Sequence, residues 1–210
     1  MFQRDEEAFH SKGSISQAMQ MQRQAMQVAI NHLQETYLKS MPLDKAAEDM
    51  AGKYAICIPV LDEGAIQPER REVDIDPSRN RTHLPYHSGR GAVVKGTEIS
   101  ISVPFQGDAE VFRLHASSYT IESPQGRIAG SAIVFRAQGT NLDPAQVRRQ
   151  FDDWLAAIKR HLAGMSQELG AFNEILRGQA MTMLTARLDK LKRDDDLLTG
   201  LGFGSSGAVS

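Results

Sequence analysis

Residues 151–176 decide the fold of this chain, and they read FDDWLAAIKRHLAGMSQELGAFNEIL. Eight apolar residues in this stretch repeat with a heptad period and are called the apolar seam below. They are Phe151, Leu155, Ile158, Leu162, Met165, Leu169, Phe172 and Leu176. Such a repeat is typical of a helix that packs along its length against another helix. The seam therefore predicts a long amphipathic helix, compatible with a coiled coil, that another helix covers.

The expected bounds of this helix are residues 141–199. Asp143 is a natural N-cap, and Pro144 at the first helical position loses no hydrogen bond. Gly164, Gly170 and Gly178 each cost about 1 kcal/mol relative to alanine, and a break near Gly164 would give a helical hairpin instead. The heptad register passes through Gly164 and Gly170 without a shift, which favours one helix. Residues 200–210 are rich in Gly and Ser and are expected to be a disordered tail.

The other end of the chain is also expected to be helical. Residues 1–13 are predicted to be disordered, and residues 14–53 to form a helical arm. The apolar residues of the arm recur at helical spacing up to about Lys39, after which Pro42 interrupts the pattern. They are Met19, Met26, Ile30, Leu33 and Tyr37.

Between these helices, residues 54–140 follow a period of two. Residues 99–105 alternate apolar and small polar side chains, as in a half-buried antiparallel strand. Further strands are expected at residues 54–60, 110–116, 118–122 and 127–136, with a weaker signal around Val73 and Ile75. Tight turns such as residues 123–126 favour an antiparallel meander or sandwich over a parallel sheet. The predicted class is therefore α+β, a small antiparallel unit flanked by an N-terminal and a long C-terminal helix.

Composition narrows the possible partners and compartments. The formal net charge is −2, so the chain has no general attraction to nucleic acid or to an anionic membrane. No apolar stretch approaches the roughly 20 residues that span a bilayer. The single cysteine, Cys57, can form no internal disulfide and lies in an apolar run, so we interpret it as a small buried side chain. These features predict a cytoplasmic protein.

The densest polar cluster is the candidate ligand site. It comprises Arg79, Arg81, His83, His87 and Arg90. Arginines can bind an anion in a bidentate manner, but a solvated loop has the same composition. Pro85 separates the two histidines, so their spacing of four does not form a helical zinc site, and we expect neither a metal nor a cofactor.

A second polar pair lies in the strand predicted at residues 110–116. Arg113 and His115 alternate with apolar residues, so both are expected on one sheet face. No nucleophile elbow, phosphate loop or other catalytic motif is found, and no catalytic residue is assigned.

Part of the chain resembles a family of uncharacterised bacterial proteins. The resemblance covers roughly residues 90–203. It is carried by the segments 94–97, 103–108, 112–113, 118–120 and 124–130, by 171–173, by Arg187 and Lys190, and by Leu198 and 201–203. It implies a β unit followed by a long helix, sometimes with an effector-like domain beyond. Because this chain ends soon after Phe203, the resemblance implies the sensing or assembly part alone.

Two classes of function remain open. The first is a non-enzymatic interaction, regulatory or assembly module that binds a protein partner or itself through its helices. Its predicted interface comprises Met19, Met26, Leu33 and the apolar seam. The alternative is a hydrolase, or a nucleotide- or anion-binding sensor, that uses the loop of residues 79–87.

Overall fold

The computed structural model of the chain describes residues 13–75, 93–116 and 126–202. These residues form two compact units. One contains Cys57–Ser166 together with the chain up to Ile15, and the other contains Ser16–Ile56 and Gln167–Ser210. The terminal segments 1–12 and 203–210, for which disorder was predicted, lie outside the described residues.

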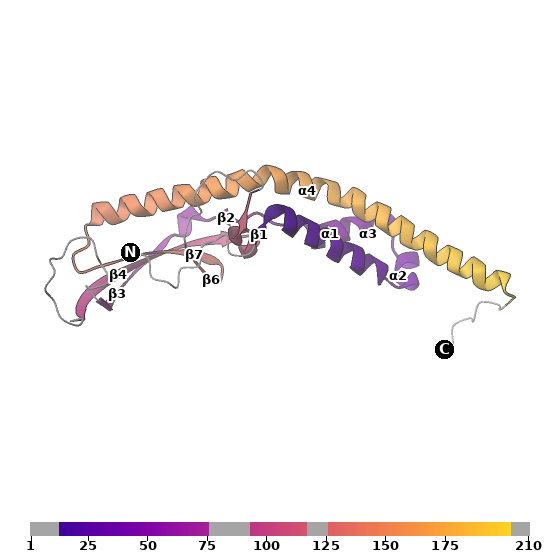
Figure 1. Ribbon diagram of the computed structural model, residues 1–210, viewed down its shortest axis with the longest axis horizontal. Helices are drawn as coiled ribbons and strands as arrows, with labels where there is room; N and C mark the ends of the chain where they lie inside the picture. Colours follow the sequence, from indigo (N-terminus) through magenta and orange to yellow (C-terminus); the bar gives the residue numbers. More distant parts are fainter. Residues whose placement is uncertain (1–12, 76–92, 117–125, 203–210) are drawn as a thin grey trace. The chain divides into compact units, whose positions relative to one another are not determined.

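The long helix, α4, runs without a break from Pro144 to Gly200 and supplies residues to both units (Figure 1). At its start the carboxylate of Asp143 accepts a hydrogen bond from the backbone N of Ala145 at 3.1 Å, as the sequence predicts for an N-cap. A Cβ atom added at Gly164, Gly170 or Gly178 would meet nothing within 4 Å. These glycines are therefore not required by close packing, and the prediction of one helix is confirmed.

The first unit is built on an antiparallel sheet. Its strands lie in the order β2 (Val60–Leu61), β4 (Val94–Gln106), β7 (Ala132–Gly139) and β6 (Arg127–Ala129), and β3 (Gln67–Ile75) also pairs with β4. All of these pairs are antiparallel. A separate two-residue parallel pair joins β1 (Gly13–Ser14) to β5 (Leu114–His115). The α+β class and the strand at residues 99–105 are thus confirmed, although β4 and β3 are longer than the sequence suggests.

Three strand predictions need correction. Residues 54–60 are not a strand, because helix α3 continues to Tyr54 and only Val60 pairs with β4. Residues 109–113 form a 3-10 turn, η3, which begins where the Asp108 carboxylate accepts from the Glu110 N at 3.0 Å. Residues 127–136 are divided between β6 and β7 by a turn at Gly130, whose φ of +59° favours glycine. The strand predicted at 118–122 lies outside the described residues.

One face of this sheet is covered by α4 itself. The ring of Phe135 on β7 packs edge-on against Phe151 at 5.7 Å between centroids and contacts Trp154 at 5.6 Å. Val103 and Ile133, which are opposite each other on β4 and β7, are fully buried. The expectation that a helix covers the whole apolar seam is therefore wrong for its first part, because a sheet face buries Phe151 equally well.

The second unit is helical. It contains α1 (Ile15–Asn31), α2 (Glu35–Ser40), α3 (Leu43–Tyr54) and the C-terminal part of α4, with α1 and α3 lying along α4 (Figure 1). The predicted first helix, which was expected to reach Lys39, is divided at His32–Gln34. At this break the carbonyl of Leu33 accepts a bond from Arg187 Nη2 on α4 at 3.4 Å. A tertiary contact thus satisfies a carbonyl left unpaired where the helix ends.

Asn173 on α4 fixes the segment that leaves α3. Its Oδ1 accepts from the Ile56 N at 3.1 Å, and its Nδ2 donates to the Ile56 O at 3.0 Å. The side-chain amide therefore satisfies both backbone groups of a residue that is only 3% exposed. In this way Asn173 substitutes for a neighbouring strand.

The next residues turn outward and approach a glycine closely. Cys57 is exposed, so its interpretation as a buried side chain is wrong. Its carbonyl accepts from the Asp108 N at 2.9 Å. Gly107 has a φ of +115°, and a Cβ there would lie 2.8 Å from the Ile58 O. Only glycine fits this close backbone approach.

Candidate functional site

A buried carboxylate lies on the polar face of the sheet, opposite the face that α4 covers. Glu98 on β4 is 1% exposed, and within the described ranges it is the one charged residue that is buried. It is opposite Arg71 on β3 and opposite Gln138 on β7. The antiparallel register therefore places a potential donor on each side of this carboxylate.

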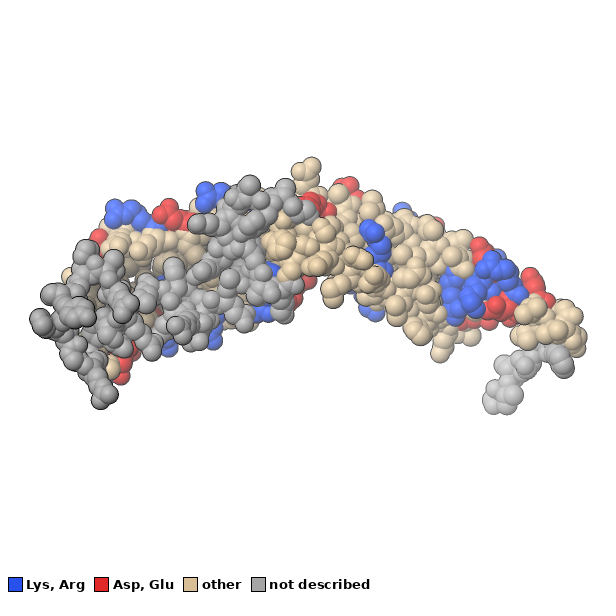
Figure 2. All heavy atoms as spheres, viewed as in Figure 1, with Lys and Arg blue, Asp and Glu red and all other residues tan. Residues whose placement is uncertain are grey.

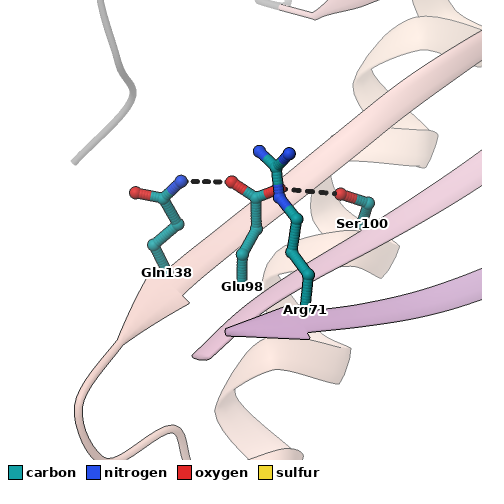
Figure 3. Close-up of polar contacts among 4 residues, drawn as sticks. All are labelled: Arg71, Glu98, Ser100 and Gln138. Carbon is teal, nitrogen blue, oxygen red and sulfur yellow. Dashed lines mark hydrogen bonds and ion pairs between the residues drawn. The ribbon is translucent and has the colours of Figure 1, made fainter. Parts of the chain in front are cut away.

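Three donors engage the Glu98 carboxylate (Figure 3). Its Oε1 contacts Arg71 Nε at 2.5 Å and accepts from the Ser100 hydroxyl at 3.2 Å. Its Oε2 accepts from Gln138 Nε2. The sharing of one carboxylate by β3, β4 and β7 fixes the register of the three strands, because a shift by one residue would remove these donors.

The protonation state of Glu98 follows from the balance of burial and donors. Burial opposes ionisation, but the hydrogen bonds from Arg71 and Gln138 and the charges of Arg71 and Arg136 outweigh it, so the pKa of Glu98 lies below its usual value. The carboxylate is therefore ionised at neutral pH. A group of this kind can fix other side chains in place but is not suited to donate a proton.

Arg136 lies on the same sheet face and differs from Arg71. It is opposite Ser100, two residues before Gln138 on β7. Its Nε is buried, and no atom in the described part of the chain accepts a hydrogen bond from it. Its charge adds to the local positive potential at Glu98. Neither Glu98 nor Arg136 was predicted as a site residue from the sequence, where the alternation of Glu98, Ser100 and Ser102 along β4 is the available signal.

The structure describes two of the predicted ligand residues, Arg113 and His115. Arg79, Arg81, His83, His87 and Arg90 lie outside the described residues. Arg113 ends η3, where its Nη1 lies 3.4 Å from Glu110 Oε1, and His115 lies in β5. Arg113 and His115 were expected on the same face of one strand. This expectation is wrong, because Arg113 belongs to η3, where Val111 and Phe112 are buried in succession and break the alternation. The alternative function of the 79–87 loop stays a prediction.

The residues predicted as an interface are largely used inside the chain. Every residue of the apolar seam is at most 7% exposed, and Met26 on α1 is fully buried. Met19 and Leu33 are half-buried. An intermolecular role for these residues stays a prediction, and a surface that binds a partner has to be sought elsewhere on the helices.

The outward face of α1 is such a surface. Met21 is 69% exposed and Val28 is 56% exposed, and they are seven residues apart on one side of the helix. The exposed residues around them are uncharged, and they are Gln17, Gln20, Gln24, Ala25 and Asn31. Together these seven residues are called the uncharged face of α1 below.

The single charged residue of α1 does not interrupt this face. Arg23 lies on another side of the helix, and its Nε bonds to Gln179 Oε1 on α4 at 3.1 Å. In Figure 2 the surface over α1 is mostly tan, the colour of residues that are neither acidic nor basic. Charged residues make up about a quarter of a typical soluble domain, so an exposed face of seven residues without any charge is distinctive.

Within residues 13–75, 93–116 and 126–202, no group of three or more His, Cys, Asp or Glu side chains could hold a metal ion. In the same ranges, no helix is both long and apolar enough to cross a membrane. Comparisons with protein-family models, with curated proteins and with solved structures give no match. The resemblance to a bacterial family stays a prediction.

Proposed function

We propose that this protein is a non-enzymatic assembly module that pairs with a second copy of itself through the uncharged face of α1. The observation that supports the proposal is the exposure of Met21 and Val28 on a helix face without charge. The proposed compartment is the bacterial cytoplasm, where a chain with one cysteine needs no disulfide.

The spacing of the two apolar residues suits a second copy. In an antiparallel pair with a two-fold axis between Gln24 and Ala25, Met21 of each copy faces Val28 of the other. A two-fold interface requires such self-complementarity. Because the face is uncharged, the two copies meet without like-charge repulsion, and the antiparallel arrangement also opposes the two helix dipoles favourably.

The strength of this contact can be bounded. Burying four side chains of this size gains roughly 1 to 2 kcal/mol each, since they are already partly covered. The gain of about 4 to 8 kcal/mol is then reduced by the entropy lost on association. The largest gain, about 8 kcal/mol, would correspond to a Kd of about 1 µM before this loss, and an entropy cost of about 4 kcal/mol weakens it to about 1 mM, so the expected dimer is weak. Residues 15–31 form a helix about 25 Å long, which is enough for one continuous contact.

Sedimentation velocity over concentrations from about 1 µM to about 1 mM tests the proposal. The wild type should shift from monomer to dimer across this range, and Met21→Lys or Val28→Glu should each weaken the dimer. The matched control is Ala186→Glu, which places a charge at an exposed position of α4. That variant should associate like the wild type.

The double variant Met21→Lys/Val28→Glu tests the arrangement of the two helices. In the antiparallel pair each new lysine faces the new glutamate of the other copy, which gives two opposite-charge pairs, so the double variant should associate more strongly than either single variant. The pair Met21→Glu/Val28→Glu should stay monomeric because like charges then face each other. A wild type that stays monomeric throughout, or single variants that associate normally, would refute self-association through α1.

A further inference from the structure

We propose that the polar face of the β3–β4–β7 sheet binds a phosphate-type oxyanion on Arg136. This site is separate from the uncharged face of α1 and does not depend on self-association. It also differs from the loop of residues 79–87, because all of its residues lie in described strands.

The first support is the unused donor on Arg136. A buried donor on a charged group that lacks an acceptor is costly, so such groups are uncommon in folded proteins and call for an explanation. The Nε of Arg136 is buried and has no acceptor in the described part of the chain. An oxyanion would supply this acceptor, and a guanidinium can bind two of its oxygens at once.

The second support is that Glu98 does not need Arg136. Arg71, Ser100 and Gln138 already supply donors to both carboxylate oxygens. Two arginines act on one carboxylate, so the cluster of Arg71, Arg136 and Glu98 carries a net charge of +1 although the charge of Arg136 also acts on Glu98. The carboxylate acts as a positioning residue, because it holds Gln138 and Arg71 on either side of β4.

The third support is the size of the side chains between the two arginines. Arg71 and Arg136 lie on strands that flank β4, roughly 10 Å apart along the hydrogen-bonding direction. On this face β4 carries Ser100 and Ser102, which are short. The side chain of Arg71 is 60% exposed, so its remaining N–H groups are accessible to a ligand. A tetrahedral anion has enough oxygens to contact both guanidiniums, whereas a planar carboxylate has only two.

The test is a titration followed by the arginine Nε–H resonances in nuclear magnetic resonance spectra. Inorganic phosphate, adenosine monophosphate and acetate would be compared with sodium chloride at equal ionic strength. We expect a saturable shift of the Arg136 resonance with phosphate and a much smaller one with acetate. An adenosine monophosphate response like that of phosphate indicates recognition of the phosphate group alone, and a tighter response indicates a phosphate ester as the ligand.

Two variants make the result specific. Arg136→Met should weaken phosphate binding about tenfold or more, as expected for the loss of charge-assisted hydrogen bonds, and should reduce the rise in Tm that phosphate causes. If that variant does not fold, Arg136→Lys keeps the charge and loses the bidentate geometry. The control is Arg70→Met, an exposed arginine of β3 opposite Ile99 on β4, which should bind phosphate like the wild type. No saturable shift with phosphate, or equal weakening by Arg70→Met, would overturn the proposal.

Discussion

Replacing two glycines of α4 by alanine should stabilise the protein. Gly164 and Gly178 are exposed within a continuous helix, and a Cβ at either position would meet nothing within 4 Å. Alanine is better than glycine inside a helix by about 1 kcal/mol. The two sites are about 21 Å apart along the helix, so their effects should add to about 2 kcal/mol.

Urea unfolding provides the measurement. Trp154 is the one tryptophan of the chain and belongs to the same unit as Gly164, so its fluorescence follows that unit, whereas far-ultraviolet circular dichroism follows the helices of both. Gly164→Ala should raise the midpoint of the fluorescence transition, and Gly178→Ala that of the dichroism transition. In thermal unfolding the double variant should gain about 4–8 °C in Tm.

Gly107→Ala is a control for which the opposite effect, a loss of stability, is expected. The φ of +115° and the carbonyl 2.8 Å away leave no room for a Cβ, so this variant should lose about 1–3 kcal/mol. If Gly164→Ala and Gly178→Ala were neutral or destabilising, the regular helix through these positions, and with it the reasoning from α4, would be refuted.

Two further predictions concern buried polar groups. Glu98→Gln should lower the free energy of unfolding at pH 7 by about 1–3 kcal/mol. Because the pKa of Glu98 in the folded protein lies below its ordinary value of 4.5, the stabilisation is present above that pH and lost as the pH falls through the lowered pKa. Urea unfolding at pH 7 and pH 3 should thus show the difference between variant and wild type shrinking, and a constant difference would contradict this role. Asn173→Ala should cost about 2–4 kcal/mol, because it leaves both backbone groups of Ile56 unsatisfied. Asn173→Asp keeps the acceptor for the Ile56 N but places a carboxylate oxygen against the Ile56 O, so it should also destabilise the protein at pH 7, and an Asp variant as stable as the wild type would argue against the two-bond contact.

Features with a strong local period were predictable from the sequence. The seam and its unshifted register through Gly164 predict α4, and the alternation at residues 99–105 predicts the core of β4. The first signal extends over a few helical turns and the second over a few residues. Neither depends on a contact with a distant part of the chain. What covers the seam was not predictable, because Phe151 has the same pattern whether a helix or the ring of Phe135 packs on it.

Features that depend on distant partners were not predictable. The buried carboxylate of Glu98 is satisfied by donors from Gln138, 40 residues away, and from Arg71, and neither donor is marked by a local pattern. Residues 54–60 read as a strand because an apolar run has the same composition in several conformations. The conformation after α3 is instead fixed by Asn173, 117 residues from Ile56.

The outward position of Cys57 has a practical consequence for work in solution. An accessible thiol on every molecule can be oxidised to a covalent link between two chains, which would imitate a reversible pair in a hydrodynamic experiment. A reducing agent, or Cys57→Ser, removes that ambiguity. The same thiol offers a unique attachment point for a maleimide dye, and with Trp154 in the same unit it provides an energy-transfer pair without any added mutation.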